Sequence, residues 1–378
     1  MSSNDHKADG QNSVEASAFG AYSLAEILSQ PQCWADCLVE LERNGKIADI
    51  RERFGHGSEW LFVGCGTSYY IALAAAASWS ALTGIRARGI PASELLLFPE
   101  LTLAGSSNFV PVLISRSGRT SEVLEAAELL SARKVSTLAI SCAAGQSLER
   151  LASTAIVLPA ADEQSTVMTR SFTSMLLGLQ YLAASVAGNK EFLQSLRELP
   201  NEAREVLRKL PGRIREFIGR KRFADYVCLG QGPYYGLACE STLKLTEMSC
   251  SYAQCFHTLE FRHGPKSIAG PETLVSFLIS ESNYEAELEV LEEIKELGAT
   301  TLAVVNKADA RARAAADFLV ELNLDLPEFA RLTPYVFFGQ LMGLYTGLQK
   351  GLDPDKPRHL SRVVILEEGE EDPQHAAI

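Results

Sequence analysis

Apolar residues fall into two kinds of run along this chain, and the two kinds alternate. Residues 21–54 carry an apolar side chain every three or four positions, the period of a helix, and 67–82 and 122–132 have the same character. Short continuous apolar runs predict strands, at 60–64, 110–115, 137–141 and 155–158. Because such strands alternating with helices are typical of parallel sheets, we expect an α/β fold with right-handed crossovers.

The pattern occurs twice. Three landmarks of the first half return in the second half 166, 165 and 164 residues later. The pairs are Gly64 and Gly230, Ser115 and Ser280, and Thr137 and Thr301. Such constant spacing is the signature of an internal repeat. We expect further helices at 176–186, 191–217 and 334–348, and the charged helix at 191–217 joins the two copies. The expected organisation is a flexible tail at 1–20, a first domain at 21–200, a second domain at 201–350 and a C-terminal tail with a disordered acidic end at 351–378.

The composition narrows the classes of protein that fit. The chain has 378 residues, 47% hydrophobic and 22% charged, with a formal net charge of −12. An acidic chain binds nucleic acid poorly because that affinity depends on neutralising phosphates, although a local site can still bind a small anion. The chain starts with polar residues and has no apolar run long enough for a bilayer. Its eight cysteines include no Cys-x-x-Cys pair. These features predict a cytoplasmic protein with no membrane contact. Cys255 and His257 have no further ligands at usable spacing, so no metal is expected.

One loop of the first half has the features of a phosphate site. Ser115-Arg116-Ser117-Gly118-Arg119-Thr120 follows a predicted strand and opens a helix. A helix N-terminus offers unpaired N–H groups and partial positive charge, and Gly118 lets the backbone approach a ligand. Gly66-Thr67-Ser68 opens the neighbouring helix. These features predict an anion site whose members are Ser68, Thr67, Ser115, Arg116, Ser117 and Thr120.

Helix capping and nucleotide binding are the alternatives to phosphate binding at these turns. Capping accounts equally well for either turn alone, because Ser and Thr are ordinary N-caps, but two such turns in one half favour phosphate. The run Gly64-x-Gly66-x-x-Tyr69 lacks the third glycine of a dinucleotide site, and no Gly-Lys-Ser/Thr marks a Walker loop. The second half carries Glu281 and Glu285 in its corresponding loop, where they would repel an anion. One anion site per chain is therefore expected.

Acid and base groups gather in the second half. Glu240, Lys244 and Glu247 recur at helical spacing and share one face, and His263 precedes a Gly-Pro turn. A carboxylate, a cation and an imidazole can together move protons on a sugar. From spacing alone, however, a surface ion-pair ladder accounts better for the three charged residues, and His263 fits a structural turn. The residues themselves leave both interpretations open.

Four motifs together resemble a known family. They are Gly64-Cys65-Gly66-Thr67-Ser68, Ser115-Arg116-Ser117-Gly118-Arg119-Thr120, Leu243-Lys244-Leu245-Thr246-Glu247 and Phe261-Arg262-His263-Gly264-Pro265-Lys266-Ser267. On these motifs the chain resembles, over about residues 20–366, proteins with two tandem sugar isomerase (SIS) domains. It is similar to the isomerase part of glucosamine-6-phosphate synthase and more closely to AgaS-type galactosamine-6-phosphate deaminase/isomerases. The resemblance implies two mostly parallel sheets flanked by helices, each a flavodoxin-like three-layer sandwich.

The resemblance also implies roles for single residues. Glu247 lies where the family's carboxylate shuttles a proton between C1 and C2, and Lys244 where a lysine offsets the enediolate charge. His263 lies where the family opens the sugar ring with a histidine, often from the neighbouring subunit, which implies a homodimer with shared sites. The matched Ser68, Ser115, Ser117 and Thr120 would bind the phosphate of a hexose or amino-hexose 6-phosphate, and no cofactor is implied. Gly66, Thr169 and His359 are further candidates to line the substrate.

The chain departs from the synthase pattern in ways that favour other chemistry. Arg116 is the AgaS-like variant of its loop. Residues 353–360 resemble the synthase tail, but Arg362 replaces the lysine that forms a Schiff base, and arginine stays protonated. With Ser2 at the second position, no glutaminase activity is expected. The expected function is phosphosugar aldose–ketose isomerase or aminosugar-6-phosphate deaminase. A fructosamine-6-phosphate deglycase and a catalytically inactive sugar-phosphate sensor stay open as alternatives.

Overall fold

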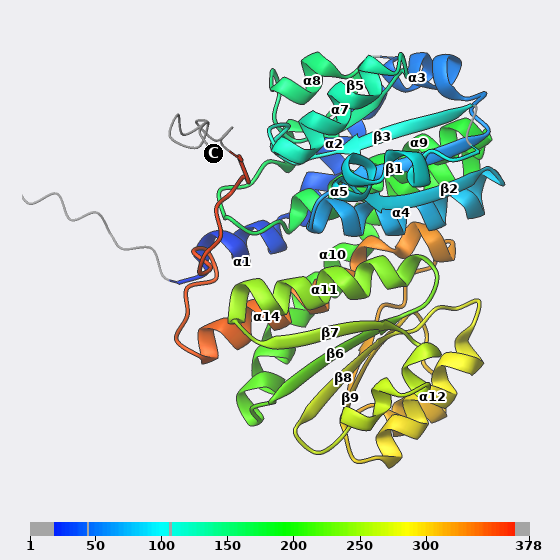
Figure 1. Ribbon diagram of the computed structural model, residues 1–378. Helices are drawn as coiled ribbons and strands as arrows, with labels where there is room; N and C mark the ends of the chain where they lie inside the picture. Colours follow the sequence, from blue (N-terminus) through cyan, green and yellow to red (C-terminus); the bar gives the residue numbers. More distant parts are fainter. Residues whose placement is uncertain (1–18, 44, 106–107, 367–378) are drawn as a thin grey trace, which may run out of the picture.

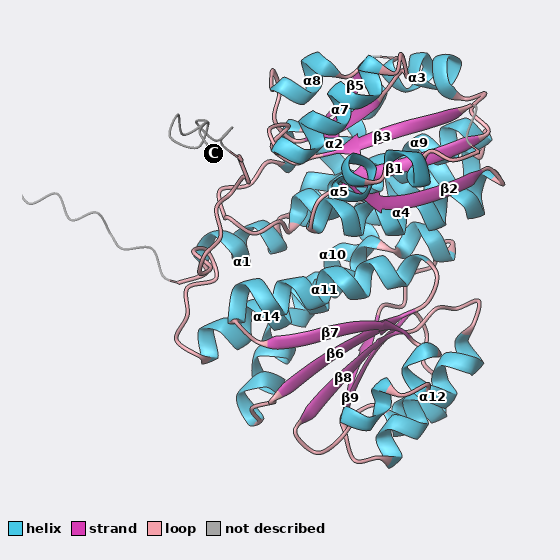
Figure 2. Cartoon of the chain, viewed as in Figure 1, coloured by secondary structure: helices cyan, strands magenta, loops and turns pink. Residues whose placement is uncertain are grey.

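A computed structural model describes residues 19–43, 45–105 and 108–366 of the chain. Most of the expected N-terminal tail and the acidic end of the C-terminal tail lie outside these residues. Two five-stranded sheets, one from each half, are separated by a layer of helices (Figures 1 and 2). The expected α/β class with two parallel sheets is confirmed.

The first sheet has the strand order β2-β1-β3-β4-β5, and every neighbouring pair is parallel. Its strands are β1 (Glu59–Gly64), β2 (Arg86–Pro91), β3 (Phe109–Ile114), β4 (Leu138–Ser141) and β5 (Thr154–Val157). The four strands predicted from continuous apolar runs are confirmed. The sequence pattern missed β2, because this edge strand is only partly buried and carries Arg86 and Arg88.

The second sheet repeats this topology. Its order is β10-β9-β8-β6-β7, again all parallel, so β6 and β8 take the places of β1 and β3. The strands are β6 (Asp225–Gly230), β7 (Tyr252–His257), β8 (Thr273–Leu278), β9 (Thr300–Val305) and β10 (Phe318–Glu321). The turn after the first strand is the same in both halves: Gly66 has φ 53° and ψ −125°, and Gly232 has φ 54° and ψ −127°. The internal repeat predicted from spacing is therefore present in the backbone.

Helices cover both faces of each sheet. Those of the first half are α1 (Ala21–Leu28), α2 (Gln30–Arg43), α3 (Lys46–Phe54), α4 (Thr67–Thr83), α5 (Ala92–Leu97), α6 (Pro99–Thr102), α7 (Ser121–Ala132), α8 (Ser147–Leu151) and α9 (Arg170–Ala187). Those that follow are α10 (Lys190–Arg220), α11 (Pro233–Ser249), α12 (Tyr284–Glu296), α13 (Ala310–Ala315) and α14 (Phe337–Gln349). The domain boundary predicted at 200–201 falls within α10, and the domain limits stay a prediction. None of the helices within the described ranges has the length and apolar character of a bilayer span.

The inner helices pack closely against one another. The largest hydrophobic cluster lies between the two sheets, and two smaller clusters fill the outer faces. Within the inner layer α11 packs against both α4 and α14 (Figure 1). Glycines make this packing close: a Cβ on Gly343 of α14 would lie 2.5 Å from the carbonyl oxygen of Lys244, and one on Gly236 would lie 2.8 Å from the nitrogen of Ala74. The helix that carries Lys244 is thus held on two sides by backbone contact.

Candidate active site

The loop after β3 adopts the turn that its sequence predicts. Gly118 has φ 62°, a conformation that glycine adopts without strain, and a Cβ there would lie 2.9 Å from Gln146 Cβ. The hydroxyls of Ser115 and Thr120 lie 2.9 Å apart, and the N–H of Arg119 donates to Ser117 Oγ. The loop ends where α7 begins, and the first N–H of that helix, of Ser121, donates to the carbonyl oxygen of Val364 at 3.3 Å.

A cavity of about 180 Å³ opens at the carboxyl ends of β1 and β3. Most of its wall comes from the first half, and Glu247 of α11 enters from the second. It is lined by Cys65, Gly66, Thr67, Ser68, Arg116, Ser117, Thr120, Thr166, Met168, Glu247, Ser361, Arg362, Val363 and Val364. Two segments far apart in the sequence, the predicted phosphate loop and the predicted acid/base helix, therefore meet at one cavity.

Lys244 is buried between two carboxylates. Its Nζ lies 2.5 Å from Glu247 Oε2 and 3.3 Å from Glu240 Oε1, and it donates to Thr67 Oγ1 at 3.3 Å. Lys244 and Glu240 are 0% exposed, so the surface ion-pair ladder favoured by spacing alone is wrong: α11 turns this face into the interior.

The two carboxylates beside Lys244, of Glu240 and Glu247, lie in different surroundings. Burial raises the pKa of Glu240 to about 8, against the opposing pull of Lys244. Burial by itself would lower the pKa of Lys244, but Glu240 and Glu247 beside it raise that pKa above its ordinary value. Glu247 keeps 18% of its side chain exposed and is the one member of the three that lines the cavity. The carboxylate of Glu247 therefore faces the cavity, and the buried ammonium group of Lys244 lies directly behind it.

Arg116 is more constrained than the sequence suggested. Its Nη1 lies 3.3 Å from Glu163 Oε2, and its Nη2 donates to the carbonyl oxygens of Thr166 and Arg362. Glu163, which the sequence analysis missed, also accepts from the N–H and hydroxyl of Thr169. Thr169 is not among the residues that line the cavity, and its expected contact with substrate stays a prediction.

The C-terminal segment forms one wall of the cavity. Asp355 accepts hydrogen bonds from the N–H groups of Tyr22 and Ser23 at the start of α1. These bonds anchor the C-terminal segment before it runs on to the first sheet (Figure 1). Beyond this anchor, Arg362 pairs with Asp162 at 2.6 Å and residues 361–364 line the cavity. His359 lies between these two points and, like His263, is not a lining residue of the cavity in its own chain.

Comparisons with known proteins agree with this architecture. A family model described as SIS domain matches residues 58–185. The crystal structure of glucosamine-6-phosphate deaminase from Thermotoga maritima superposes with a TM-score of 0.75 at 30% identity, covering 91% of this chain and 100% of that one. The chain belongs to the SIS family. Because the second sheet repeats the topology of the matched half, the protein carries two tandem SIS folds.

Two further similar proteins extend the comparison. Tagatose-6-phosphate ketose/aldose isomerase from Escherichia coli has a TM-score of 0.81 at 23% identity, covering 93% of this chain and 97% of that one, which shows the shared fold. A glutamine–fructose-6-phosphate aminotransferase of Bacteroides thetaiotaomicron is 28% identical over 372 residues. This match covers 94% of the present chain but 60% of the relative, so the chain spans about three-fifths of that protein's length.

In the second SIS fold, the loop that corresponds to residues 115–120 binds a carboxylate of its own chain. The N–H groups of Glu281 and Ser282 donate to Glu328 Oε1 at 2.8 and 3.2 Å, and the hydroxyls of Ser282 and Tyr234 add further hydrogen bonds to this carboxylate. Glu281 does not keep this carboxylate away, because Arg331 pairs with Glu281 and offsets its charge. This repeat of the turn thus holds an anion of its own chain. The expectation of one ligand-anion site per chain stays a prediction.

No group of three or more His, Cys, Asp or Glu side chains within the described ranges is arranged to hold a metal ion.

Proposed function

We propose that this SIS protein is an enzyme that moves a proton between C1 and C2 of an open-chain hexose 6-phosphate. It acts as an aldose–ketose isomerase or, on an amino sugar, as a deaminase. The observation that carries the proposal is the single cavity in which the loop of the first half faces Glu247 of the second. The deaminase name of the Thermotoga maritima relative, which this chain covers completely, supports the same chemistry.

The first half would bind the phosphate. Ser68, Ser117 and Thr120 line the cavity, and Ser115 supports Thr120 from behind. In the second half the matching turn already binds the carboxylate of Glu328 through backbone N–H and hydroxyl donors. This internal anion supports the proposal that the open loop of the first half accepts a phosphate.

The second half would move the proton. Glu247 takes the proton from C2 and returns it at C1, passing through an enediol or an enolamine, while buried Lys244 offsets the negative charge. When C2 carries an amino group, the resulting imine adds water and releases ammonia, leaving the ketose phosphate. In this scheme His263 of a neighbouring subunit opens the ring, since it does not line the cavity of its own chain. None of these steps needs a cofactor.

Two features bear on the alternatives. The cavity of about 180 Å³ adjoins a second one of about 390 Å³, and the two share Arg116, Ser117, Arg362 and Val363, so the space at this site leaves both a simple hexose phosphate and a bulkier fructosamine conjugate open. A buried lysine flanked by two carboxylates is costly to maintain, and a pure sensor has no need of it. This second point favours an enzyme over a sensor.

The test is turnover by Glu247→Gln. We expect turnover to fall by ~10²–10⁴-fold while phosphosugar binding, measured by calorimetry, changes little, because the variant loses the proton acceptor and keeps the phosphate loop. Ammonia release from amino-sugar 6-phosphates and ketose formation from aldose 6-phosphates separate the two activities. Glu202→Gln on the exposed face of α10 is the matched control and should leave turnover unchanged. Unchanged turnover in Glu247→Gln would refute the proposal.

A further inference from the structure

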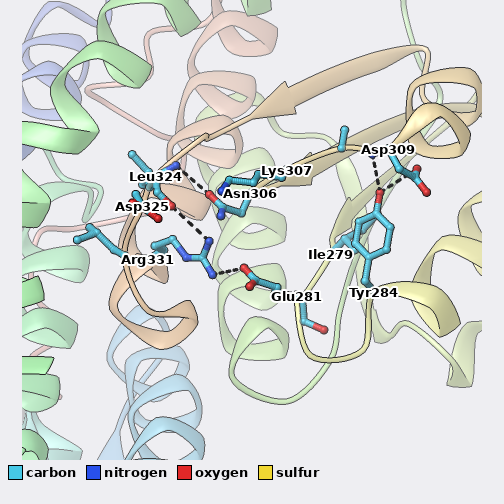
Figure 3. Close-up of a pocket in the computed structure, with 12 residues that line it drawn as sticks. Ile279, Glu281, Tyr284, Asn306, Lys307, Asp309, Leu324, Asp325 and Arg331 are labelled. Carbon is cyan, nitrogen blue, oxygen red and sulfur yellow. Dashed lines mark hydrogen bonds and ion pairs between the residues drawn. The ribbon is translucent and has the colours of Figure 1, made fainter. Parts of the chain in front are cut away.

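A second, larger cavity lies in the other half of the molecule. It measures about 420 Å³ and opens at the carboxyl ends of β8 and β9, the edge where open α/β sheets bind ligands. It shares no lining residue with the cavity that contains Glu247. Its wall combines apolar and polar side chains, among them Tyr284, Asn306, Asp309, Leu324, Asp325 and Arg331 (Figure 3).

Two buried side chains of this wall have unused hydrogen-bond donors. Asn306 is 6% exposed; its Oδ1 accepts from the N–H of Leu324, but its amide nitrogen has no hydrogen bond within the described part of the chain. Arg331 is 2% exposed and pairs with Glu281, yet its Nε also lacks a partner among the described residues. Buried polar groups are rarely left unpaired, and the Nε of Arg331 is such a group, while the amide nitrogen of Asn306 adds a donor on the cavity wall. The two donors favour a ligand that carries acceptor oxygens.

The cavity is unsuited to a phosphate. The backbone donors of the adjoining turn, the N–H groups of Glu281 and Ser282, are already taken by Glu328. Three carboxylates, of Glu281, Asp309 and Asp325, line the cavity against the two cations of Lys307 and Arg331, and this net negative lining disfavours a dianion. The same carboxylates are good acceptors for hydroxyl or ammonium groups.

We propose that this cavity binds an unphosphorylated hexose or hexosamine. The half-buried ring of Tyr284 and the side chain of Leu324 supply apolar surface for the C–H face of a sugar ring. The carboxylate of Asp325 accepts from hydroxyls, as does the Oδ2 of Asp309, whose Oδ1 already accepts from Tyr284 and Ala312. Asn306 and Arg331 donate to ring and hydroxyl oxygens. The site is separate from the proposed reaction and does not depend on it.

Calorimetry on the full chain with glucose, glucosamine, galactosamine and their 6-phosphates tests this inference. We expect an unphosphorylated sugar to bind, and Asp325→Ala and Tyr284→Ala each to weaken that binding by about tenfold. Both variants should keep the wild-type turnover of phosphosugar. Ser117→Ala and Glu247→Gln, which alter the other cavity, should leave this binding intact.

Two outcomes would overturn the inference. One is the absence of both binding heat and thermal stabilisation with every unphosphorylated sugar. The other is binding that is lost in Ser117→Ala but retained in Asp325→Ala, which would assign the sugar to the first cavity. Because the assay measures binding of unphosphorylated sugars, it can succeed even if the proposed turnover fails, and the reverse also holds.

Discussion

At the scale of single residues, the buried titratable groups of α11 make the free energy of unfolding depend on pH. Glu240 has no exposed surface, and the pKa of its carboxyl is raised from an ordinary value of 4.5 to about 8. Between these two values the folded chain holds a proton at Glu240 that the unfolded chain has released. The free energy of unfolding contributed by this group therefore falls as pH rises through that interval.

This linkage gives a prediction for Glu240→Gln. The amide cannot titrate, so the fall in unfolding free energy between about pH 5 and pH 8 should be shallower than in the wild type, as measured by denaturant unfolding at a series of pH values. Glu287, whose pKa burial raises to about 7, contributes in the same direction and should preserve part of the slope. The exposed change Glu202→Gln should leave the slope as it is. An equal slope in Glu240→Gln and wild type would contradict the raised pKa.

At the scale of elements, the contact between α11 and α14 decides where Lys244 and Glu247 lie. Gly339, Gly343 and Gly347 recur every four residues on α14 and form one stripe against α11. A Cβ at each would meet Ser241, the carbonyl oxygen of Lys244 or the carbonyl oxygen of Met248 at less than 3.0 Å. The stripe brings two helix backbones closer than any larger side chain allows.

We predict that Gly343→Ala destabilises the protein by about 1–3 kcal/mol, because the new methyl group must push α11 away. Displacement of Lys244 and Glu247 should also lower turnover, which steady-state kinetics would detect. The matched control is Gly219→Ala in α10, where nothing lies within 4 Å of the added Cβ. That change should raise stability by about 0.5–1 kcal/mol, since alanine favours helix over glycine. Equal effects of the two substitutions would argue against close helix packing at Gly343.

At the scale of the whole molecule, the cavity of one chain lacks the histidine that the family resemblance implies for the site. His263 follows a short turn in the second half and does not line the cavity that holds Glu247. A homodimer in which each subunit supplies His263 to the other would complete it. This arrangement is a prediction that follows from the family resemblance.

Mixing inactive variants tests the shared site. Glu247→Gln and His263→Ala subunits, unfolded and refolded together in equal amounts, should regain about a quarter of wild-type turnover. Half of the dimers then carry one of each, with one intact site of two. Each variant refolded alone is the control and should stay inactive on the ring form of the substrate. Failure of the mixture to regain activity, with dimers present by sedimentation, would place His263 in its own subunit's site or outside the reaction.

Much of this organisation was predictable from the residue pattern because it depends on local chemistry. Strands buried on both faces, such as β1 and β3, are almost wholly apolar, with Glu59 at the start of β1 as the exception, and the landmarks at their carboxyl ends, Gly64 and Ser115, revealed the repeat. The loop from Ser115 to Thr120 was recognisable because small hydroxyl residues and a glycine at a helix start are typical of anion binding. The edge strand β2 escaped prediction because partial burial removes that apolar signature.

By itself, then, the sequence determined the α/β fold that occurs twice, the turn from Ser115 to Thr120 that is predicted to bind an anion, and the charged residues that α11 carries. Only the tertiary structure decided whether Glu240 and Lys244 face water or the interior, since helical spacing is the same in both cases. Only the tertiary structure shows that Glu247 lies at the cavity beside the loop at 115–120 of the first half, and that Glu328 binds to the corresponding loop of the second half. These contacts join residues distant in the chain, and packing between the two sheets, rather than any local preference, brings them together.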